Sequence, residues 1–256
     1  YYEAFRNSIK KMNEWISDGM IDIYWNVVKE YRRIATECNV NDLKPVYDAY
    51  HELGIVVYNS GDSKKASEID AEYVKFVEEA NDAYALAKAL NALAFDLSAN
   101  HLYSEAYSHG KRSLEVALDA ILRVAEEKKN KIAGSLYEFY KQFFLLPENN
   151  KESCQQEIES FIKQNSNLLN TIHTISEADD SYIVKVLWEQ MLTTRGNIPW
   201  YFIEDKDSRA KHARFALDYG KTTYLLRKYY YGADNPKTLQ SFHNTGAYLL
   251  KYAEYC

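Results

Sequence analysis

The fold is decided by residues 50–66, which read YHELGIVVYNSGDSKKA, and by residues 90–106, which read LNALAFDLSANHLYSEA. In each stretch, large apolar residues at three- and four-residue spacing surround one small residue, Gly54 in the first and Ala94 in the second. Another small residue, Ala66 or Ala106, follows twelve positions later, and the two stretches are offset by 40 residues. Two antiparallel helices approach closely where small residues face each other. Each stretch therefore predicts a helical hairpin in which its two small residues face each other.

A third copy of the first-helix pattern occurs near the end of the sequence. Phe242, Thr245, Gly246 and Leu249 repeat the spacing of the earlier copies. The second helix of this copy would lie beyond Cys256, so we expect the chain to stop in mid-repeat. A single hairpin cannot bury both of its faces and has to stack on the next one. The pattern therefore predicts an all-α fold, a solenoid of stacked antiparallel helical hairpins.

Composition and periodicity favour the same fold class. Nine Gly and four Pro in 256 residues are too few for the tight turns of a doubly wound α/β domain, a TIM barrel or a β-sandwich. Apolar residues recur at three- and four-residue spacing along nearly the whole chain. We expect helices at residues 2–17, 20–38, 43–59, 64–81, 83–100, 103–127, 131–145, 151–174, 181–195, 207–230 and 236–255.

The two quoted stretches and residues 225–250, LLRKYYYGADNPKTLQSFHNTGAYLL, resemble the tetratricopeptide repeat (TPR) family, especially the longer repeats of kinesin light chains. The resemblance implies a right-handed superhelix whose concave groove binds peptides or protein segments. Residues 1–41 show no motif and are expected to form a helical pair that caps the array. Residues 42–256 hold the TPR-like repeats. Residues 130–200 are degenerate, because Tyr140 and Trp188 stand where small residues are expected.

The resemblance also implies which residues hold a ligand. Asn residues in the first helix of each pair often bind the ligand backbone, and Asn91 and Asn244 occupy the matching positions. An Asn amide both donates and accepts hydrogen bonds, so it binds a peptide backbone with little sequence preference. Helical geometry adds neighbours on the same faces: Lys88, Phe95 and Ser98 beside Asn91, Gln240, Ala247 and Lys251 beside Asn244, and His51, Ile55 and Tyr58 in the first unit.

A dense group of aromatic residues gives a second candidate for a partner anchor. One short predicted helix contains five of them, namely Tyr137, Phe139, Tyr140, Phe143 and Phe144. Five aromatic side chains cannot all face one core, so we expect some of them to be exposed. Exposed aromatic side chains mark interfaces. The alternative is burial between neighbouring hairpins.

Catalytic, metal-binding and cofactor-binding motifs are not found. The sequence has no HExxH, GxSxG, Walker or GxGxxG motif, and no metal-ligand set accompanies its six His. The three cysteines, Cys38, Cys154 and Cys256, are widely spaced and form no CxxC, so neither a disulfide framework nor a zinc site is expected. A Cys–His nucleophile pair involving Cys154 stays open as an alternative. We therefore expect no enzymatic activity from these residues, no metal and no cofactor.

Charge and hydropathy limit the classes of partner. The net charge of −6 argues against direct binding of nucleic acid, and no stretch approaches the ~18 apolar residues that span a membrane. A cytoplasmic location is expected. The function that fits best is a non-enzymatic scaffold of a larger protein, which binds a protein or peptide segment in its groove and contacts further domains of its own chain. The alternatives are a peptide-sensing domain that controls an attached effector or DNA-binding domain, and the regulatory arm of an enzyme such as a caspase-like peptidase.

Overall fold

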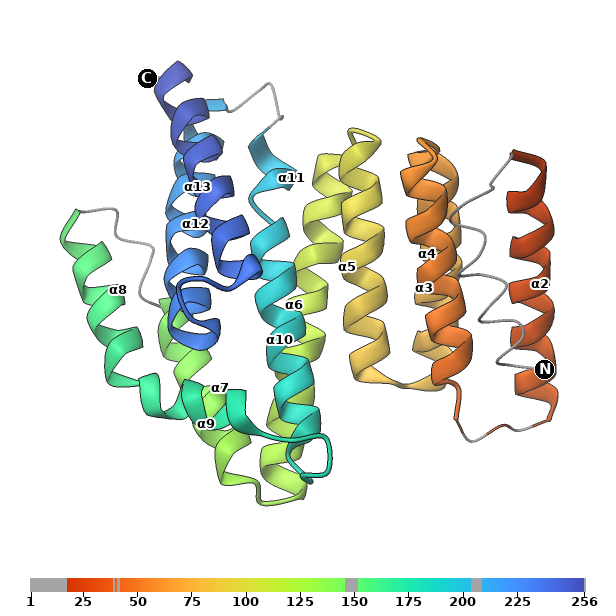
Figure 1. Cartoon of the computed structure of the whole chain (residues 1–256), viewed down its shortest axis with the longest axis horizontal. Coiled ribbons are helices and arrows are strands. Elements are labelled where there is room, and N and C mark those ends of the chain that lie inside the picture. The colour runs from red at the N-terminus through yellow and green to blue at the C-terminus, as the bar shows by residue number, and fades with distance from the viewer. Residues whose placement is uncertain (1–17, 39, 41, 146–151, 204–208, 256) are drawn as a thin grey trace. The chain divides into compact units, whose positions relative to one another are not determined.

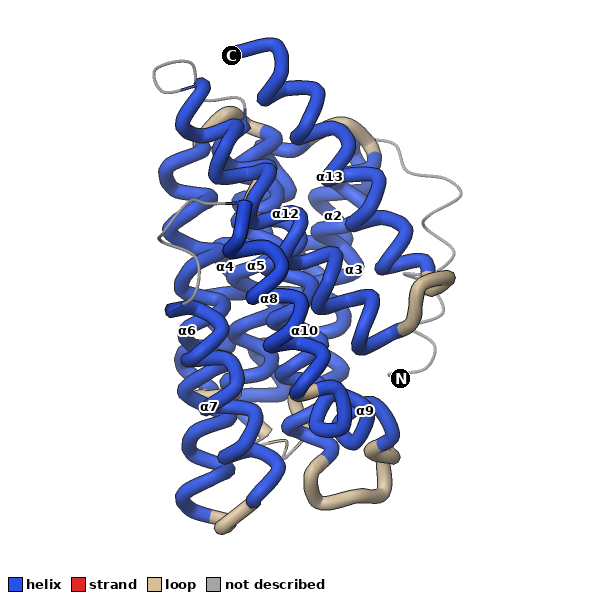
Figure 2. Tube along the Cα trace, turned by 90° about the vertical axis from the view of Figure 1, so that its left-hand side faces the viewer, coloured by secondary structure: helices blue, strands red, loops and turns tan. Residues whose placement is uncertain are grey.

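The protein is all-α in the part of the chain that the structure, a computed structural model, describes: residues 18–38, 40, 42–145, 152–203 and 209–255. Figure 1 shows the helices, and Figure 2 shows that helices and loops make up these residues. The helices are α2 (Asp18–Glu37), α3 (Lys44–Asn59), α4 (Ser63–Ala80), α5 (Ala83–Ala99), α6 (Tyr103–Glu127), α7 (Lys131–Leu145), α8 (Glu152–Gln164), α9 (Ser166–Thr174), α10 (Tyr182–Asn197), α11 (Trp200–Ile203), α12 (Arg209–Tyr231) and α13 (Pro236–Tyr255). The fold class is confirmed as all-α with sequential antiparallel packing. The helix predicted at 2–17 lies outside the described residues.

The chain divides into two compact units, Tyr1–His109 and Gly110–Cys256. In the first unit, α2 packs on α3, α3 on α4, and α4 on α5, while α3 and α5 also touch each other. In the second unit, α12 packs on α13 and also contacts α8, α9, α10 and α11. The first unit thus repeats one simple pattern, whereas the second is built around α12.

Short turns with capping residues join α3 to α4 and α4 to α5. Gly61 adopts a φ of 94° in the turn after α3, a conformation that glycine accepts without steric cost. Asp62 then accepts a hydrogen bond from the backbone N–H of Lys65, and Asp82 accepts one from Ala85. These carboxylates satisfy N–H groups that the first turn of a helix leaves unpaired. The predicted boundaries of α3, α4 and α5 are therefore correct to within one residue.

Two predictions for the second unit were wrong. Residues 151–174, expected as one helix, form α8 and α9, which are separated at Asn165. The Asn165 side chain donates to the carbonyl oxygen of Phe161 at 2.9 Å, and such local bonds compete with helix propagation. The short helix α11 was also missed, because Pro199 and the turn before it were interpreted as a helix end only.

The small residues of the two quoted stretches lie in the interior, as expected for a helical seam. Ala66, Ala94 and Ala106 are fully buried. The closest neighbour of Gly54, however, is not Ala66 but the side chain of Asp70, one turn further along α4. A Cβ atom on Gly54 would lie 2.6 Å from Oδ1 of Asp70. Glycine is required here because a carboxyl group fills the space in front of it.

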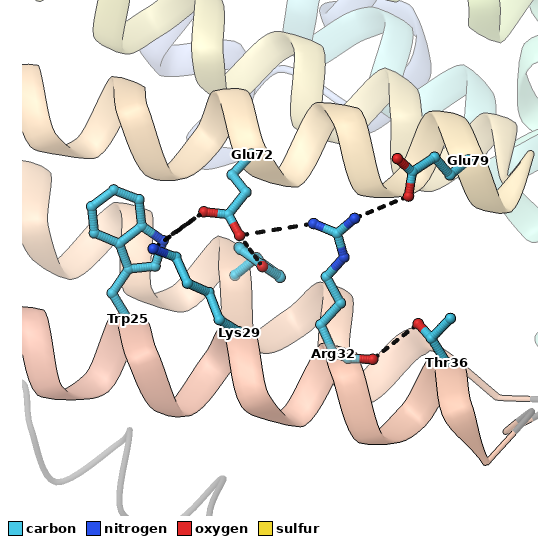
Figure 3. Close-up of polar contacts among 7 residues, drawn as sticks. Trp25, Lys29, Arg32, Thr36, Glu72 and Glu79 are labelled. Carbon is cyan, nitrogen blue, oxygen red and sulfur yellow. Dashed lines mark hydrogen bonds and ion pairs between the residues drawn. The ribbon is translucent and has the colours of Figure 1, made fainter.

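A polar cluster centred on Glu72 fixes α2 to the α3–α4 hairpin (Figure 3). Trp25 on α2 donates its indole N–H to Glu72 on α4 at 3.1 Å, and the hydroxyl of Tyr50 on α3 donates to the same carboxylate at 2.9 Å. Arg32 lies 3.8 Å from Glu72 and donates to Glu79 at 2.9 Å. Three helices thus share one half-buried carboxylate, which sets the position of α2 on its neighbours.

Large aromatic side chains form the core of the second unit. Trp188 on α10 is fully buried and meets Tyr140 on α7 edge to face, with ring centroids 6.2 Å apart. The rings of Phe139 and Tyr230 pack on the same indole, with centroid distances of 6.1 and 6.2 Å. Tyr140 and Trp188 are the two residues that stand where the repeat pattern expects small ones. Helices with rings at such positions pack through edge-to-face contacts in place of close backbone approach.

Candidate peptide-binding face

Helices α3 and α5 lie side by side and share one surface of the first unit, the α3–α5 face, which we define as Asp48, His51, Ile55 and Tyr58 on α3 with Lys88, Asn91 and Phe95 on α5. The ammonium group of Lys88 lies 4.0 Å from a carboxylate oxygen of Asp48. These two residues are 40 positions apart, which is the offset between the two quoted stretches. Five of the predicted site residues therefore share this face, namely His51, Tyr58, Lys88, Asn91 and Phe95.

The apolar end of the face is formed by an aromatic pair. The rings of Tyr58 and Phe95 have centroids 5.1 Å apart and an interplanar angle of 56°. Phe95 is 40% exposed, and Ile55, one turn before Tyr58, is 43% exposed. Large apolar side chains that stay this accessible next to each other are typical of binding surfaces. This pair is the apolar part of the α3–α5 face.

The polar end of the face carries one carboxylate and two ammonium groups. Asp48 lies between two lysines, with Lys44 at 2.7 Å and Lys88 at 4.0 Å. Burial lowers the pKa of Lys88, although the nearby Asp48 carboxylate opposes this effect. Burial, with the positive charge of Lys88 beside it, lowers the pKa of His51 to about 4. His51 is therefore neutral at physiological pH. Its Nδ1 atom is buried, with no hydrogen-bond partner among the described residues.

The remaining predicted residues lie in the second unit, on α13. In the amide orientation that satisfies both neighbours, Asn244 accepts from the indole N–H of Trp200 at 3.2 Å and donates to the carbonyl oxygen of Gln240 at 3.2 Å. Lys251 pairs with Glu254 at 3.6 Å. Asn91 and Asn244 thus belong to different units, and Asn244 has an intramolecular task of its own that the sequence pattern did not reveal.

For three of the five aromatic residues of the predicted helix 131–145, the alternative, burial, is confirmed. Phe139, Tyr140 and Phe143 on α7 are all buried, because they pack on Trp188 and Phe161 inside the second unit. Tyr137 is half-buried, and the side chain of Phe144 lies outside the description. Helix α7 packs on several helices and not on a single one. It can therefore bury more aromatic side chains than one helix–helix contact would allow.

Directly behind the face lies a feature that the sequence analysis missed. Asp70 on α4 and Asp96 on α5 are both buried, and their carboxyl groups are in hydrogen-bond contact. Burial is the main cause that raises the pKa of both groups, to about 7 for Asp96 and well above its ordinary value for Asp70. Oδ1 of Asp70 and Oδ2 of Asp96 have no conventional donor among the described residues. A proton shared between the two carboxyl groups supplies the missing hydrogen bond.

A sequence signal for this pair existed. Asp70 and Asp96 each occupy a position of the apolar stripe of their helix, four residues after Ala66 and three after Leu93. A charged residue on the buried stripe needs a partner. A comparison of the apolar stripes of α4 and α5 would have identified Asp70 and Asp96 as candidates for a buried pair of carboxyl groups.

In the described part of the chain, no cluster of three or more His, Cys, Asp or Glu side chains has the geometry of a metal site. Within the same residues, no helix combines the length and the apolar character needed to cross a membrane. Neither the protein-family models nor the curated proteins include a match to this sequence.

Proposed function

We propose that this chain is a non-enzymatic scaffold of TPR-like helical hairpins that binds a peptide segment, and that the α3–α5 face is the binding surface in its first unit. The observation that carries the proposal is the Tyr58–Phe95 pair, in which Phe95 is 40% exposed and Tyr58 is half-buried. The pair lies between two helices that the repeat pattern designates as first helices. An interface of this kind depends on a few aromatic anchors with polar groups around them.

The two ends of the face suggest how a peptide is held. An apolar side chain packs on Ile55, Tyr58 and Phe95, and the polar end supplies one carboxylate and two ammonium groups. Asn91 lies between these ends on α5, at the position to which the TPR resemblance assigns a contact with the peptide backbone.

A selection from a displayed library of random 12-residue peptides tests the proposal. The wild-type chain is used as bait, and enriched peptides are then assayed against Phe95→Ala. The matched control is Phe215→Ala, because Phe215 is 38% exposed and its ring lies 5.3 Å from Tyr219, much as Phe95 lies beside Tyr58. Peptides that lose binding only to Phe95→Ala support the proposal. Failure to enrich any peptide, or equal binding to both variants, contradicts it.

A further inference from the structure

The carboxyl pair of Asp70 and Asp96 lies directly behind the α3–α5 face and touches both helices that form it. On α5, Phe95 is 40% exposed on the face, whereas the next residue, Asp96, is 4% exposed. Asp70 reaches α3 from α4, since its carboxyl group fills the space in front of Gly54, the residue before Ile55. A movement of the carboxyl pair is therefore transmitted to the residues next to Ile55 and Phe95 on the surface.

The surroundings of the carboxyl pair fit its protonated form only. Each acid acts on the other, and no described basic side chain compensates the charge of either. Oδ1 of Asp70 and Oδ2 of Asp96 are buried without a hydrogen-bond donor among the described residues. Two carboxylates in such a place are costly, whereas one shared proton removes a charge and supplies a hydrogen bond. The close packing of α3, α4 and α5 therefore depends on that proton.

The helices around the carboxyl pair offer few other groups that titrate near pH 7. Burial raises the pKa of Tyr50 on α3 and of Tyr73 on α4, so both hydroxyls stay protonated. Burial lowers the pKa of His51 on α3 to about 4, and Lys88 on α5 lies about two turns away, at the polar end of the face. On α6, His109 has a buried Nδ1 atom, and an ordinary histidine titrates at about 6.5. His109 is therefore the group from which the carboxyl pair has to be distinguished.

Loss of the shared proton should move α5 relative to α3. Two carboxylates without a counter-ion repel each other and have to gain either distance or water. Asp70 cannot retreat toward α3, because a Cβ atom on Gly54 would already lie 2.6 Å from its Oδ1 atom. The separation therefore has to come from α5, which carries Phe95 away from Tyr58, at a ring-centroid distance of 5.1 Å in the closed packing. Packed helices respond to such strain by switching between discrete arrangements.

We propose that the carboxyl pair is a proton switch of the α3–α5 face: the shared proton holds Phe95 against Tyr58, and its loss opens the face and releases the peptide. The release of a peptide rests on the proposed function, whereas the opening of the face does not. A ligand that binds the protonated form better loses affinity as the pH rises. Because burial raises the pKa of Asp96 to about 7, the dissociation constant should rise at least about tenfold from pH 6 to pH 9.

Fluorine NMR tests the opening of the face without a ligand. Para-fluorophenylalanine replaces the Phe residues biosynthetically, and the Phe95 signal is the one that Phe95→Ala lacks. In the wild type this signal should shift between pH 6 and pH 9. Asp70→Asn supplies the missing donor through its NH₂ group, so the signal should stay at its low-pH position, and Asp96→Asn should act in the same way if Asp70→Asn does not fold. The exposed Asp119 is the matched control, and Asp119→Asn should titrate like the wild type.

Binding of a peptide enriched at pH 6 tests the second part, with affinities measured by fluorescence anisotropy at pH 6 and pH 9. The wild type should lose at least about tenfold in affinity, and Asp70→Asn should bind equally at both values. A Phe95 signal that ignores pH, that still shifts in Asp70→Asn, or that stops shifting only in His109→Gln overturns the switch.

A signal that shifts while the peptide affinity stays constant overturns the control of binding. If no peptide binds at either pH, the proposed function fails and the control of binding fails with it. The Phe95 signal then still decides whether the shared proton moves the face.

Discussion

Asp70 and Asp96 hold two buried carboxyl groups in hydrogen-bond contact between α4 and α5, and Asp70 also fills the space in front of Gly54 on α3. Three consecutive helices therefore meet at one pair of acidic side chains. Two adjacent carboxylates in a buried site cannot both be ionised at low cost, so the pair holds a proton when the protein is folded. The stability of the first unit should depend on this proton.

The sign of the pH dependence follows from the raised pKa values. An unfolded Asp has a pKa of about 3.9, whereas burial raises the folded pKa of Asp96 to about 7 and raises that of Asp70 well above its ordinary value. The folded chain thus binds more protons between these limits. The stability that the carboxyl pair contributes is therefore complete below about pH 4 and is lost as the pH rises through about 7. Asp70→Asn mimics the protonated carboxyl. It should flatten this dependence and stabilise the protein by about 2 kcal/mol at pH 8.

Urea denaturation at pH 5 and pH 8 measures this effect. The exposed Asp119 provides a matched control, and Asp119→Asn should leave the difference between the two pH values unchanged. An unfolding free energy of Asp70→Asn that keeps the wild-type pH dependence would show that the pair shares no proton.

Two glycines at the same motif position should respond in opposite directions to the same substitution. Gly54→Ala places a methyl group 2.6 Å from Asp70, so it should destabilise the chain by about 1–3 kcal/mol in spite of the higher helix propensity of Ala. Gly246→Ala has open space and should stabilise the chain by up to about 1 kcal/mol. Thermal and urea unfolding of both variants provide the measurement. A similar gain in the unfolding free energy of both variants would mean that the side chain of Asp70 does not limit the space at position 54.

The Glu72 cluster should control the docking of α2. Glu72→Ala removes the acceptor of both Trp25 and Tyr50, so α2 should lose about 1–2 kcal/mol of local stability. Glu79→Ala breaks only the more exposed bond to Arg32 and should cost no more than about 0.5 kcal/mol. Amide hydrogen exchange over α2 reports the two effects separately. Equal protection of α2 in the two variants would contradict the role assigned to Glu72.

In the second unit, Arg227 should be the most sensitive charged residue. Its guanidinium is buried and donates to the carbonyl oxygens of Leu192 and Lys237, at 2.7 and 3.0 Å, and to the hydroxyl of Ser241 at 2.8 Å. These three acceptors come from α10 and α13, so Arg227 links both helices to α12. Lysine cannot reach three acceptors with the same planar geometry.

We therefore expect Arg227→Lys to lower the unfolding free energy by about 2–3 kcal/mol. The control is Arg214→Lys, because Arg214 is half-exposed, pairs with Asp218 at 2.9 Å and donates only a long bond of 3.4 Å to the hydroxyl of Tyr252 on α13. That change should stay within about 0.5 kcal/mol. Chemical denaturation of both variants distinguishes the two sites, and an equal loss in the two would contradict the linking role of Arg227.

The sequence was sufficient to predict the hairpins of the first unit, because the small residues and the capping residues there follow a regular spacing. The face shared by α3 and α5 could be predicted for the same reason, since residues 40 positions apart, such as Asp48 and Lys88, become neighbours. The carboxyl pair was missed because a local pattern does not say which residues of two stripes face each other. Asn165 and the aromatic core around Trp188 departed from the repeat, so the second unit was predicted less well.

The binding role of the α3–α5 face is the central claim, and an affinity measurement tests it most directly. A peptide enriched on the wild-type chain is labelled and titrated by fluorescence anisotropy with wild type, Phe95→Ala and Phe215→Ala. Loss of an aromatic anchor typically costs about 2 kcal/mol, so Phe95→Ala should weaken binding roughly 30-fold. Phe215→Ala should stay within about twofold. Equal affinity for wild type and Phe95→Ala would contradict the account.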